Sequence, residues 1–531
     1  MAGRLGIDFG TSNTVLAVWD AAAGEARSFG IPELSRPFEY RGESVPVIPS
    51  LISYQADGST WIGAQVLDRG LDESETTFRW MKRYISARSP RRRRVGEREL
   101  GEQEAGREFL VTLLRLALAE TGAFDEEVVY TLPVEAYEHY EDWVARVSDD
   151  VGLTRYRMID EASAAALGYG VHIQPGDAYL VFDFGGGTLQ ASVVLVEEGA
   201  DASAGGQRCR VLGKAGAEVG GSTIDGWLFE QVVRENGLLP EDPLVRRVSR
   251  RLLAACERAK MTLSSQEETD VGATDDEGGA SLSLHLTRRD FDDLLDAHDL
   301  MLTIHQTLQR ALGMSAERGY AEDGIKAVLS VGGSGLIPAV HRTLEQHFGR
   351  ERVQTGRPMD AVARGAAAFA AGVSFYDFIQ HDYALRHTDM DSGEYRYRTL
   401  LKAGTPYPTE KPLATVTIKA TYDGQTQFGL DIFELGFRRD GSGGGPVELV
   451  FDPQGAVQLT QVGNREAADR TRFWINEQSP TFLSTARGAA QGEPCFRLEF
   501  GVDANKRLTV TATDLQSGEV PFSRHPVVRL T

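Results

Sequence analysis

The sequence predicts a duplicated α/β domain that holds a phosphorylated ligand, followed by an all-β domain. Residues 5–18 (LGIDFGTSNTVLAV) read as two short apolar strands joined by a tight turn. Residues 179–196 (YLVFDFGGGTLQASVVLV) repeat this pattern, which suggests two related halves that clamp one phosphate chain between them. From Glu394 onward, strand-like runs alternate with turn clusters, which is typical of a β-sandwich.

The turn of the first hairpin has the chemistry of an anion site. Gly10 frees the backbone, and the small donors Thr11, Ser12 and Asn13 follow it. Successive N–H groups in such a turn form a concave nest for an anionic oxygen. Asp8, near the end of the first strand, is better placed for a metal ion on the phosphate than for the phosphate itself. Many hairpins contain Gly and Thr, so this turn alone does not identify a phosphate site.

The second hairpin repeats the arrangement with a run of glycines. Asp183 is followed by Gly185, Gly186, Gly187 and Thr188. Each hairpin therefore contains Asp-Phe-Gly, which also occurs in protein kinases. The kinase interpretation fails because no H-R-D catalytic loop or V-A-I-K strand accompanies the tripeptide.

Composition and charge exclude several classes of protein. The 531 residues should form about three or four domain-sized units. The net charge of −21 argues against a nucleic-acid partner. The three cysteines, Cys209, Cys256 and Cys495, are widely spaced and give neither a disulfide framework nor a metal-binding pattern. Because no signal segment and no apolar run of ~18 residues is present, we expect a soluble cytoplasmic protein without a membrane partner.

Between the hairpins, periodicity predicts helices over 107–121 and 136–151 and a buried strand over 128–132. A helix of small residues is expected over 162–169. Glu161 lies where a strand turns into that helix. It either aims a carboxylate at a ligand or only favours the helix N-terminus electrostatically.

Two basic features of the first half are ambiguous. Lys82, in the segment 76–85, is by default one more solvated lysine. The run Arg91–Arg94 beside Pro90 could be a nucleic-acid patch, but in so acidic a chain a solvated loop is favoured.

The second half contains two more glycine turns at helix starts. Gly220 and Gly221 open a helix, where backbone donors can meet phosphate. A strand over 326–330 runs into the glycine turn 332–335, the order of a nucleotide-contacting loop.

Two helices complete this part of the chain. The predicted helix 250–263 places Glu257, Lys260 and Ser264 on one face, which alone would be an ordinary surface ion pair with a C-terminal serine. The helix 361–371 is small enough to pack closely against another helix.

The remaining segments define the expected domains. Strands are predicted over 395–402, 414–421, 427–434, 496–502 and 508–513. The expected boundaries are 1–375 for the nucleotide-binding domain, 376–392 for a linker and 393–531 for the β-sandwich.

Taken together, these segments resemble the seventy-kilodalton heat-shock chaperone family, the DnaK-type proteins, over nearly the whole chain. The motifs occur in the family's order: GIDFGTSN (6–13), MKRYI (81–85), IDEASAAALGYG (159–170), VFDFGGGT (181–188), and ERAKMTLSS (257–265) with VGGSG (331–335). The stretches 402–412 and 502–514 look like that family's peptide-binding β-domain.

The resemblance implies an actin-like, ribonuclease H-like duplicated ATPase with ATP and Mg²⁺ in the cleft between two lobes. Lys82 and Glu161 would sit by the attacking water and the γ-phosphate, with Asp183 and Thr188 also catalytic. Asp8 and Asp183 would position a hydrated Mg²⁺. This fits phosphoryl transfer, which needs charge neutralisation and positioning and little else.

The resemblance also implies a set of residues that contact ATP or ADP. The phosphates would be held by Gly10, Thr11, Ser12, Asn13, Gly186, Gly187 and Thr188. The rest of the nucleotide would be held by Gly220, Gly221, Glu257, Lys260, Ser264, Gly332, Gly333 and Ser334.

The chain departs from the family's pattern in several places. Gln190 replaces an aspartate that the family associates with a monovalent cation, and Leu336 replaces an arginine that flanks adenine. Glu141 replaces the arginine of the family's interdomain relay from Pro133. The segment 388–395, which replaces an apolar peptide arch, is largely polar, and no helical lid follows the β-domain. The variant is therefore expected to be lidless.

Two functions from different classes follow. The first is a chaperone-like ATPase with weak turnover, coupled to a protein or peptide client on the β-sandwich and possible co-chaperones. The second is a nucleotide-dependent interaction module that hydrolyses ATP negligibly and docks one dedicated protein. A third, an actin-fold sugar kinase, lacks a recognisable substrate-side aspartate and does not explain the β-domain.

Overall fold

The computed structural model describes residues 4–122, 127–133, 138–153, 155–169, 176–198, 207–275, 279–371, 374–376, 379, 381–389, 394–403, 405, 407–435, 447–451, 457–461, 472–477, 480–503 and 507–530. The chain divides into two compact units. The first comprises Met1–Val134, Trp143–Tyr376 and Val447–Thr460, and the second comprises Glu135–Asp142, Asp377–Pro446 and Gln461–Thr531.

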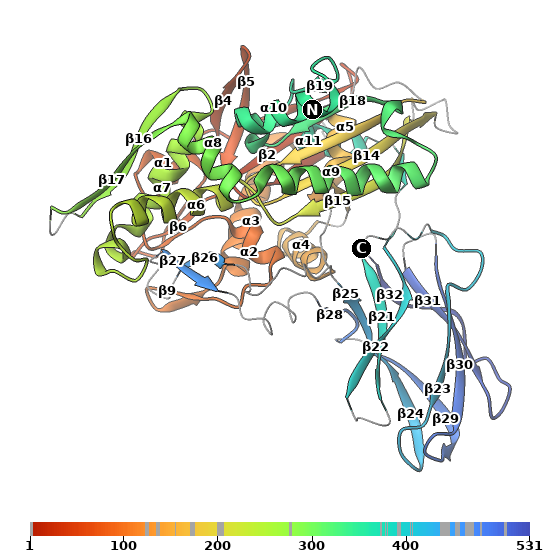
Figure 1. Ribbon diagram of the computed structural model, residues 1–531. Coiled ribbons are helices and arrows are strands. Elements are labelled where there is room, and N and C mark those ends of the chain that lie inside the picture. Colours follow the sequence, from red (N-terminus) through yellow and green to blue (C-terminus); the bar gives the residue numbers. More distant parts are fainter. Residues whose placement is uncertain are drawn as a thin grey trace. The chain divides into compact units, whose positions relative to one another are not determined.

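The first sheet of the first unit is built around the N-terminal hairpin. Strand β1 (Leu5–Phe9) pairs antiparallel with β2 (Asn13–Asp20), which is labelled in Figure 1, and parallel with β11 (Val128–Leu132). β12 (Tyr156–Asp160) then pairs parallel with β11. The hairpin expected over 5–18 and the strand expected over 128–132 are therefore present.

The second sheet repeats this topology around the second hairpin. Strand β13 (Ala178–Phe184) pairs antiparallel with β14 (Leu189–Glu198) and parallel with β18 (Ile325–Val331). β19 (Val353–Gln354) pairs parallel with β18, as β12 does with β11. The two halves of the unit thus contain topologically equivalent sheets, as a duplicated fold requires.

The other elements of the first unit extend and cover these sheets. Its remaining strands are β3 (Glu25–Phe29), β4 (Arg36–Tyr40), β5 (Glu43–Pro49), β6 (Ile52–Tyr54), β7 (Thr60–Ile62), β8 (Thr77–Phe78), β9 (Arg93–Val95), β10 (Arg98–Leu100), β15 (Gln207–Ala217), β16 (Glu268–Thr274), β17 (Ser281–Thr287) and β20 (Ser374–Tyr376). The helices are α1 (Ala64–Asp68), α2 (Met81–Ser86), α3 (Glu102–Thr121), α4 (Glu138–Val151), α5 (Glu161–Tyr169), α6 (Gly221–Glu235), α7 (Pro243–Leu263), α8 (Arg288–Ala297), α9 (Leu300–Glu317), α10 (Pro338–Phe348) and α11 (Ala361–Ala370), with short 3-10 turns η3 (Glu322–Gly324) and η4 (Gly333–Leu336). Of α4, only the part from Trp143 onward belongs to this unit.

Two helices begin earlier than their apolar periodicity predicts. α3 begins at Glu102 and not at 107; there the Gly101 N–H donates to Glu104 Oε2 at 3.1 Å, as in a capping box. α7 begins at Pro243 and not at 250, because proline suits the first helical position, where its missing N–H is not needed. Local capping signals, and not hydrophobic periodicity, set both starts.

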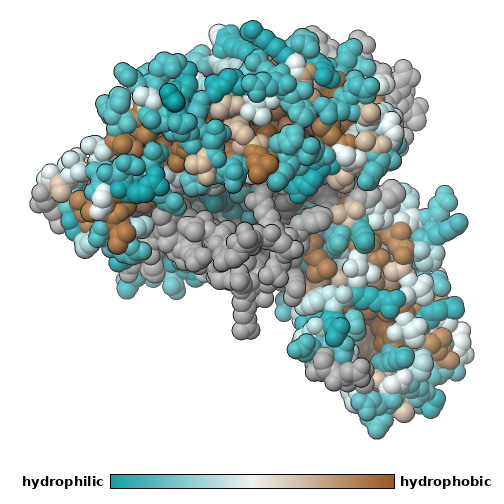
Figure 2. Space-filling model, viewed as in Figure 1, coloured by the Kyte–Doolittle hydropathy of each residue, from teal (hydrophilic) through white to brown (hydrophobic). Residues whose placement is uncertain are grey.

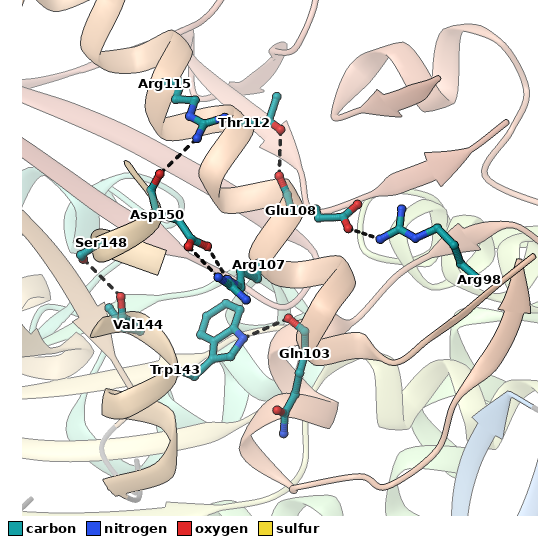
Figure 3. Close-up of polar contacts among 10 residues, drawn as sticks. All are labelled: Arg98, Gln103, Arg107, Glu108, Thr112, Arg115, Trp143, Val144, Ser148 and Asp150. Carbon is teal, nitrogen blue, oxygen red and sulfur yellow. Dashed lines mark hydrogen bonds and ion pairs between the residues drawn. The ribbon is translucent and has the colours of Figure 1, made fainter. Parts of the chain in front are cut away.

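Polar contacts join α3 to the part of α4 from Trp143 onward (Figure 3). Arg107 of α3 forms an ion pair with Asp150 of α4, and Trp143 Nε1 donates to Gln103 O at 3.0 Å. Arg115 also donates to Asp150 O at 3.1 Å. The two helices are thus linked by one ion pair and by hydrogen bonds to backbone carbonyls, in addition to the apolar face that α3 buries.

Helices α5 and α11 cross with almost no space between their backbones. A Cβ atom added to Gly365 would lie 1.6 Å from Ala164 O, and one added to Gly168 would lie 1.7 Å from Ala361 O. α11 also lies against β1, where a Cβ on Gly6 would lie 2.4 Å from Ala367 N. The small residues of α11 therefore permit the close helix packing that the sequence predicts.

The solvated loop expected at Arg91–Arg94 is wrong for Arg93. Arg93 begins β9 and is buried, with its guanidinium 3.6 Å from the centre of the Phe78 ring and donating to Thr77 O at 3.1 Å. Burial lowers the pKa of Arg93 to about 10. The Phe78 ring and the Thr77 carbonyl offset the cost of burying this charge. Neither contact can be recognised in the sequence from a run of arginines.

The second unit is a β-structure with one shared core. Its sheets have the strand orders β22-β21-β25-β28, β23-β30-β31-β32 and β24-β29. The strands are β21 (Asp382–Thr388), β22 (Tyr395–Leu401), β23 (Ala414–Lys419), β24 (Gln425–Leu430), β25 (Ile432–Leu435), β28 (Arg472–Trp474), β29 (Thr481–Ala489), β30 (Pro494–Val502), β31 (Arg507–Asp514) and β32 (Phe522–Arg529). Buried side chains from all three sheets, among them Tyr383, Phe428 and Phe496, form a single cluster.

Two expectations about this unit differ from the structure. The single strand expected over 427–434 is two strands, β24 and β25, which pair in different sheets on either side of Asp431. The linker expected over 376–392 contains β21, whose residues 383–385 are buried in succession. Between β24 and β25 the alternation of buried residues continues through Leu430 and Ile432, so the change of sheet leaves no mark on the pattern. In β21 consecutive buried residues interrupt the alternation on which strand prediction depends.

A short hairpin from the C-terminal part of the sequence belongs to the first unit. It consists of β26 (Val447–Phe451) and β27 (Val457–Gln461). Val457 is 1% exposed in the main apolar core, and its N–H donates to Ser249 Oγ of α7 at 2.9 Å. The C-terminal part of the sequence therefore contributes Val457 to the core of the first unit.

The visible surface fits the acidic, polar composition. In Figure 2, hydrophilic residues are interspersed with small groups of apolar ones. Among the described residues, none of the helices is both long and apolar enough to span a bilayer.

Candidate nucleotide-binding site

The two hairpin turns predicted to bind phosphate lie against each other. A Cβ atom added to Gly186 would lie 2.5 Å from Ser12 Oγ, and one added to Gly187 would lie 2.5 Å from Thr11 Oγ1. A larger residue at either glycine would displace these hydroxyls. Backbone N–H groups and small hydroxyls from both halves therefore gather at one place, as an anion site requires.

Ser50, which sequence reasoning missed, holds the first turn in shape. Its Oγ donates to Gly10 O at 2.8 Å, and its N–H donates to Ser12 O at 2.9 Å. Thr14 Oγ1 lies 2.9 Å from Ser50 Oγ. The turn is so tight that a Cβ on Gly10 would lie 2.1 Å from Asn13 O. Nothing in the sequence around Pro49 marks this serine as a contact of the first turn, so this support could not be predicted.

Gly220 and Gly221 lie directly beside the second turn. The Gly221 N–H donates to Gly185 O at 3.0 Å, and a Cβ on Gly220 would lie 2.6 Å from Gly187 C. Ser334 Oγ also donates to Gly185 O, at 2.8 Å. Since the Gly221 N–H bonds within the protein, Gly221 supports the second turn and does not offer this donor to a ligand.

Gly332 and Gly333 have different surroundings. Gly332 has φ +83°, and a Cβ there would lie 2.4 Å from Phe184 O and 2.8 Å from Asp183 Oδ1. Only glycine permits this approach to the end of β13. At Gly333, the nearest atom to an added Cβ is Met359 Sδ at 3.7 Å, so the space beside this glycine is open.

Three carboxylates and a lysine meet where the two turns face each other. Lys82 Nζ forms a hydrogen-bonded ion pair with Glu161 Oε1, and both side chains are less than one-tenth exposed. Asp8 and Asp183 interact electrostatically with this pair, and Thr131 Oγ1 donates to Asp8 Oδ1 at 3.0 Å. The solvated-lysine interpretation of Lys82 is therefore wrong.

The charges of this cluster do not balance. Burial raises the pKa of Asp8 to about 6, although Lys82 opposes the rise. Burial, followed by repulsion from Glu161 and Asp8, raises the pKa of Asp183 well above its ordinary value. One lysine faces three carboxyl groups, so the site favours an additional positive charge.

Gln190 connects two of the predicted catalytic residues. Its Nε2 donates to Glu161 Oε2 at 3.1 Å and to Thr188 Oγ1 at 3.2 Å. The sequence marked Gln190 only as a departure from the resembled family, and the structure shows its contacts.

These residues fit a hydrated magnesium ion. Within the ranges that the structure describes, no three His, Cys, Asp or Glu side chains are arranged to ligate a metal directly. Mg²⁺ usually keeps several waters and binds through one or two carboxylates together with phosphate oxygens. Asp8 and Asp183, with their excess negative charge, suit this mode of binding.

Lys260 lies close to Ser334 on the far side of the glycine turns. A Cβ on Gly221 would lie 2.8 Å from Ser334 Oγ and 2.9 Å from Lys260 Nζ. Lys260 Nζ donates to Gly221 O at 3.0 Å and lies 2.8 Å from Asp225 Oδ1. Ser264 follows at the C-terminal end of α7, where its Oγ donates to Lys260 O at 3.1 Å. The residues expected to hold the nucleoside thus share one region.

Asp225 and Arg79, two partners that the sequence did not reveal, complete this region. Burial raises the pKa of Asp225 to about 6 against the opposing charge of Lys260. Arg79 forms an ion pair with Glu257. Burial alone would raise the pKa of Glu257, but Arg79 and Lys260 outweigh it and hold this pKa below its usual value.

Comparisons with known proteins find relatives of this chain. A family model described as Hsp70 protein matches residues 117–422, more than half of the chain. The chaperone protein DnaK of Trichormus variabilis (strain ATCC 29413 / PCC 7937) is 27% identical over 547 residues, which cover 97% of this chain and 70% of that protein. Hsp70 proteins are ATP-binding chaperones with ATPase activity. The predicted resemblance is therefore confirmed, and this chain belongs to the Hsp70 family.

Proposed function

We propose that the protein binds Mg²⁺-ATP where its two hairpin turns meet, hydrolyses it slowly and uses the nucleotide to control protein or peptide binding by its β-domain. The observation that carries this proposal is the buried cluster of Asp8, Asp183, Glu161 and Lys82 between the turns. Buried charges persist only with a use or a partner, and this cluster has more negative charge than its lysine offsets.

The chain's own residues suit the phosphate half of the reaction. Thr11, Ser12 and the glycine turn at Gly186 offer donors to phosphate oxygens. Asp8 and Asp183 would hold Mg²⁺ through water. Bound Mg²⁺ would supply neutralisation of the charge that develops on the transferred phosphoryl group.

Glu161 and Lys82 are the groups suited to the attacking water. Glu161 is fixed through Lys82 at one oxygen and Gln190 at the other. A carboxylate held in this way can accept a hydrogen bond from a water and keep it in line with the phosphorus. Lys82 offsets the charge that gathers during transfer.

The nucleoside would lie toward α7. Lys260, Ser334 and the open space beside Gly333 provide polar groups and room for it, with Glu257 and Ser264 on the same helix face. Lys260 and Glu257 already have partners in the chain, so nucleotide binding would exchange or extend these contacts.

The β-domain is the proposed site for a protein or peptide client, and co-chaperones are expected to regulate the cycle in the cytoplasm. The largely polar segment 388–395 of this domain is only partly described. Asp389 forms an ion pair with Arg396 at 2.7 Å, and its N–H donates to Glu394 O at 2.8 Å. Asp391 and Ser392 lie outside the described residues. Since Asp389 already has a basic partner in the chain, a basic client segment would have to compete with Arg396.

The proposal is tested by calorimetry and single-turnover hydrolysis with the full-length protein. Mg²⁺-ATP should bind more tightly than ATP in EDTA, and bound ATP should turn over above the rate in buffer. Binding without turnover would favour the alternative, a nucleotide-dependent interaction module. Absence of nucleotide binding would refute both.

A further inference from the structure

A row of buried polar side chains on the second sheet lies against the start of α5. Gln190 and Ser192 are two residues apart on β14 and therefore share a face. Lys214 of β15 pairs with Ser192 in the strand register, so it belongs to the same face. All three are less than one-tenth exposed. Buried polar groups are costly unless they have partners, and Gln190 and Lys214 both have them.

Two members of this row hold consecutive residues at the start of α5. Lys214 Nζ lies 3.2 Å from Asp160 Oδ2. Asp160 accepts the Ser163 N–H at 2.9 Å, which is the contact of a helix N-cap. Gln190 then holds Glu161, the first residue of the helix, at 3.1 Å. The second half of the duplicated domain therefore holds both Asp160, which caps the N-terminus of α5, and Glu161, the first residue of that helix.

The chemistry of an amide also orients Thr188. A carboxylate only accepts hydrogen bonds, so the Gln190 amide must present its NH₂ group and not its oxygen to Glu161. The second N–H of that NH₂ group is directed at Thr188 Oγ1, 3.2 Å away. Because the Thr188 oxygen accepts this bond, its own hydrogen is available to donate to a phosphate oxygen.

We propose that Gln190 and Lys214 are positioning residues for ATP hydrolysis. Gln190 aims Glu161 and turns the Thr188 hydroxyl into a donor, while Lys214 fixes the helix start through Asp160. This inference rests on the proposed function. It goes further because it makes the positions of Glu161 and Thr188 depend on residues of the second half of the domain, Gln190 and Lys214.

Gln190→Glu gives the sharpest test because it keeps the size of the side chain and reverses its chemistry. A glutamate here would repel Glu161 and accept the Thr188 hydrogen. In the full-length protein at pH 8 we expect single-turnover hydrolysis to fall about 30-fold or more, while ADP affinity changes less than about 3-fold. Lowering the pH toward 6 should restore part of the loss, since a protonated glutamate can donate again.

Three further variants separate positioning from packing. Gln190→Met keeps the volume without donors and should slow hydrolysis at every pH, with no selective recovery in acid. Lys214→Met should also slow hydrolysis with ADP affinity retained. Ser192→Ala is the matched control, because its Oγ lies on the same face and makes no hydrogen bond within the described part of the chain. It should hydrolyse ATP at the wild-type rate.

The outcomes distinguish this inference from the proposed function. If wild type shows no turnover, the proposed function fails and the inference fails with it. If wild type turns over and Gln190→Glu and Gln190→Met match it, only the inference is overturned. If Gln190→Glu loses ADP binding, the Gln190→Met variant decides between the outcomes. Hydrolysis by Gln190→Met at the wild-type rate would overturn the inference, whereas slow hydrolysis with normal ADP affinity would support it.

Discussion

Gly365→Ala should force the crossing helices α5 and α11 apart and destabilise the first unit. The new Cβ would lie 1.6 Å from Ala164 O, whereas real Cβ contacts are essentially never shorter than 3.0 Å. The obstructing atom belongs to the backbone of α5, so it cannot move without the helix. Overpacking costs about 1–3 kcal/mol and occasionally more, whereas replacing a helical glycine with alanine gains only about 1 kcal/mol. At this separation we expect the cost to dominate, with a net loss of about 2 kcal/mol or more.

The measurement is differential scanning calorimetry of the full-length protein, following the transition of larger enthalpy, which belongs to the larger unit. Gly313→Ala is the matched control, because Gly313 lies within α9 and is exposed, with no atom within 4 Å of an added Cβ. It should gain about 0.5–1 kcal/mol. Gly365→Ala should lower the melting temperature by several degrees. An unchanged or raised melting temperature for Gly365→Ala would refute the close crossing.

Three more predictions concern charged groups of the site. Asp183→Asn should weaken Mg²⁺-ATP far more than ATP in EDTA, and equal losses by calorimetry would remove its metal role. Lys82→Ala should slow single-turnover hydrolysis by about 10²-fold with ADP affinity nearly unchanged, because the lost contact acts in the transition state; a parallel loss of ADP affinity would contradict this. The pKa of Asp225 is raised from 3.8 to about 6, so the folded state binds this proton more tightly than the unfolded state does. The free energy of unfolding should therefore fall by about 3 kcal/mol as the pH rises from about 4 to about 6. Asp225→Asn should lack this fall, so thermal midpoints of the two proteins measured from pH 4.5 to 7.5 should diverge toward high pH, and parallel curves would count against the buried charge.

Structural elements that depend only on short stretches of sequence could be predicted. Both hairpins, the strand before Pro133 and the position of Glu161 at a strand–helix junction follow from local patterns of apolar, small and turn-forming residues. Their assembly into one site does not follow from local patterns. Lys82 and Glu161 are 79 positions apart, and only the resemblance to a family related them before the structure did.

Features that depend on tertiary partners were missed. Arg93 is buried because Phe78 and a backbone carbonyl receive it, and neither is visible in a run of arginines. Gln190 is recognisable in the sequence as an unusual residue, but its contact is with Glu161, the first residue of α5 in the other half of the unit. The division between β24 and β25 was hidden because Leu430 and Ile432 are both buried, so the change of sheet leaves no polar interruption apart from Asp431.

The hairpin β26–β27 determines how this protein can be cut into fragments. A fragment ending near residue 375, where the sequence predicts the domain boundary, lacks Val457 and leaves the Ser249 hydroxyl without the N–H that it receives in the intact chain. Losing one buried valine costs about 1.5–3 kcal/mol and uncovers apolar surface next to α7. The complementary C-terminal fragment would carry that hairpin with its docking surface removed. Truncated forms should therefore be less stable and more prone to aggregate than the intact chain, and activities measured on them would understate those of the whole protein.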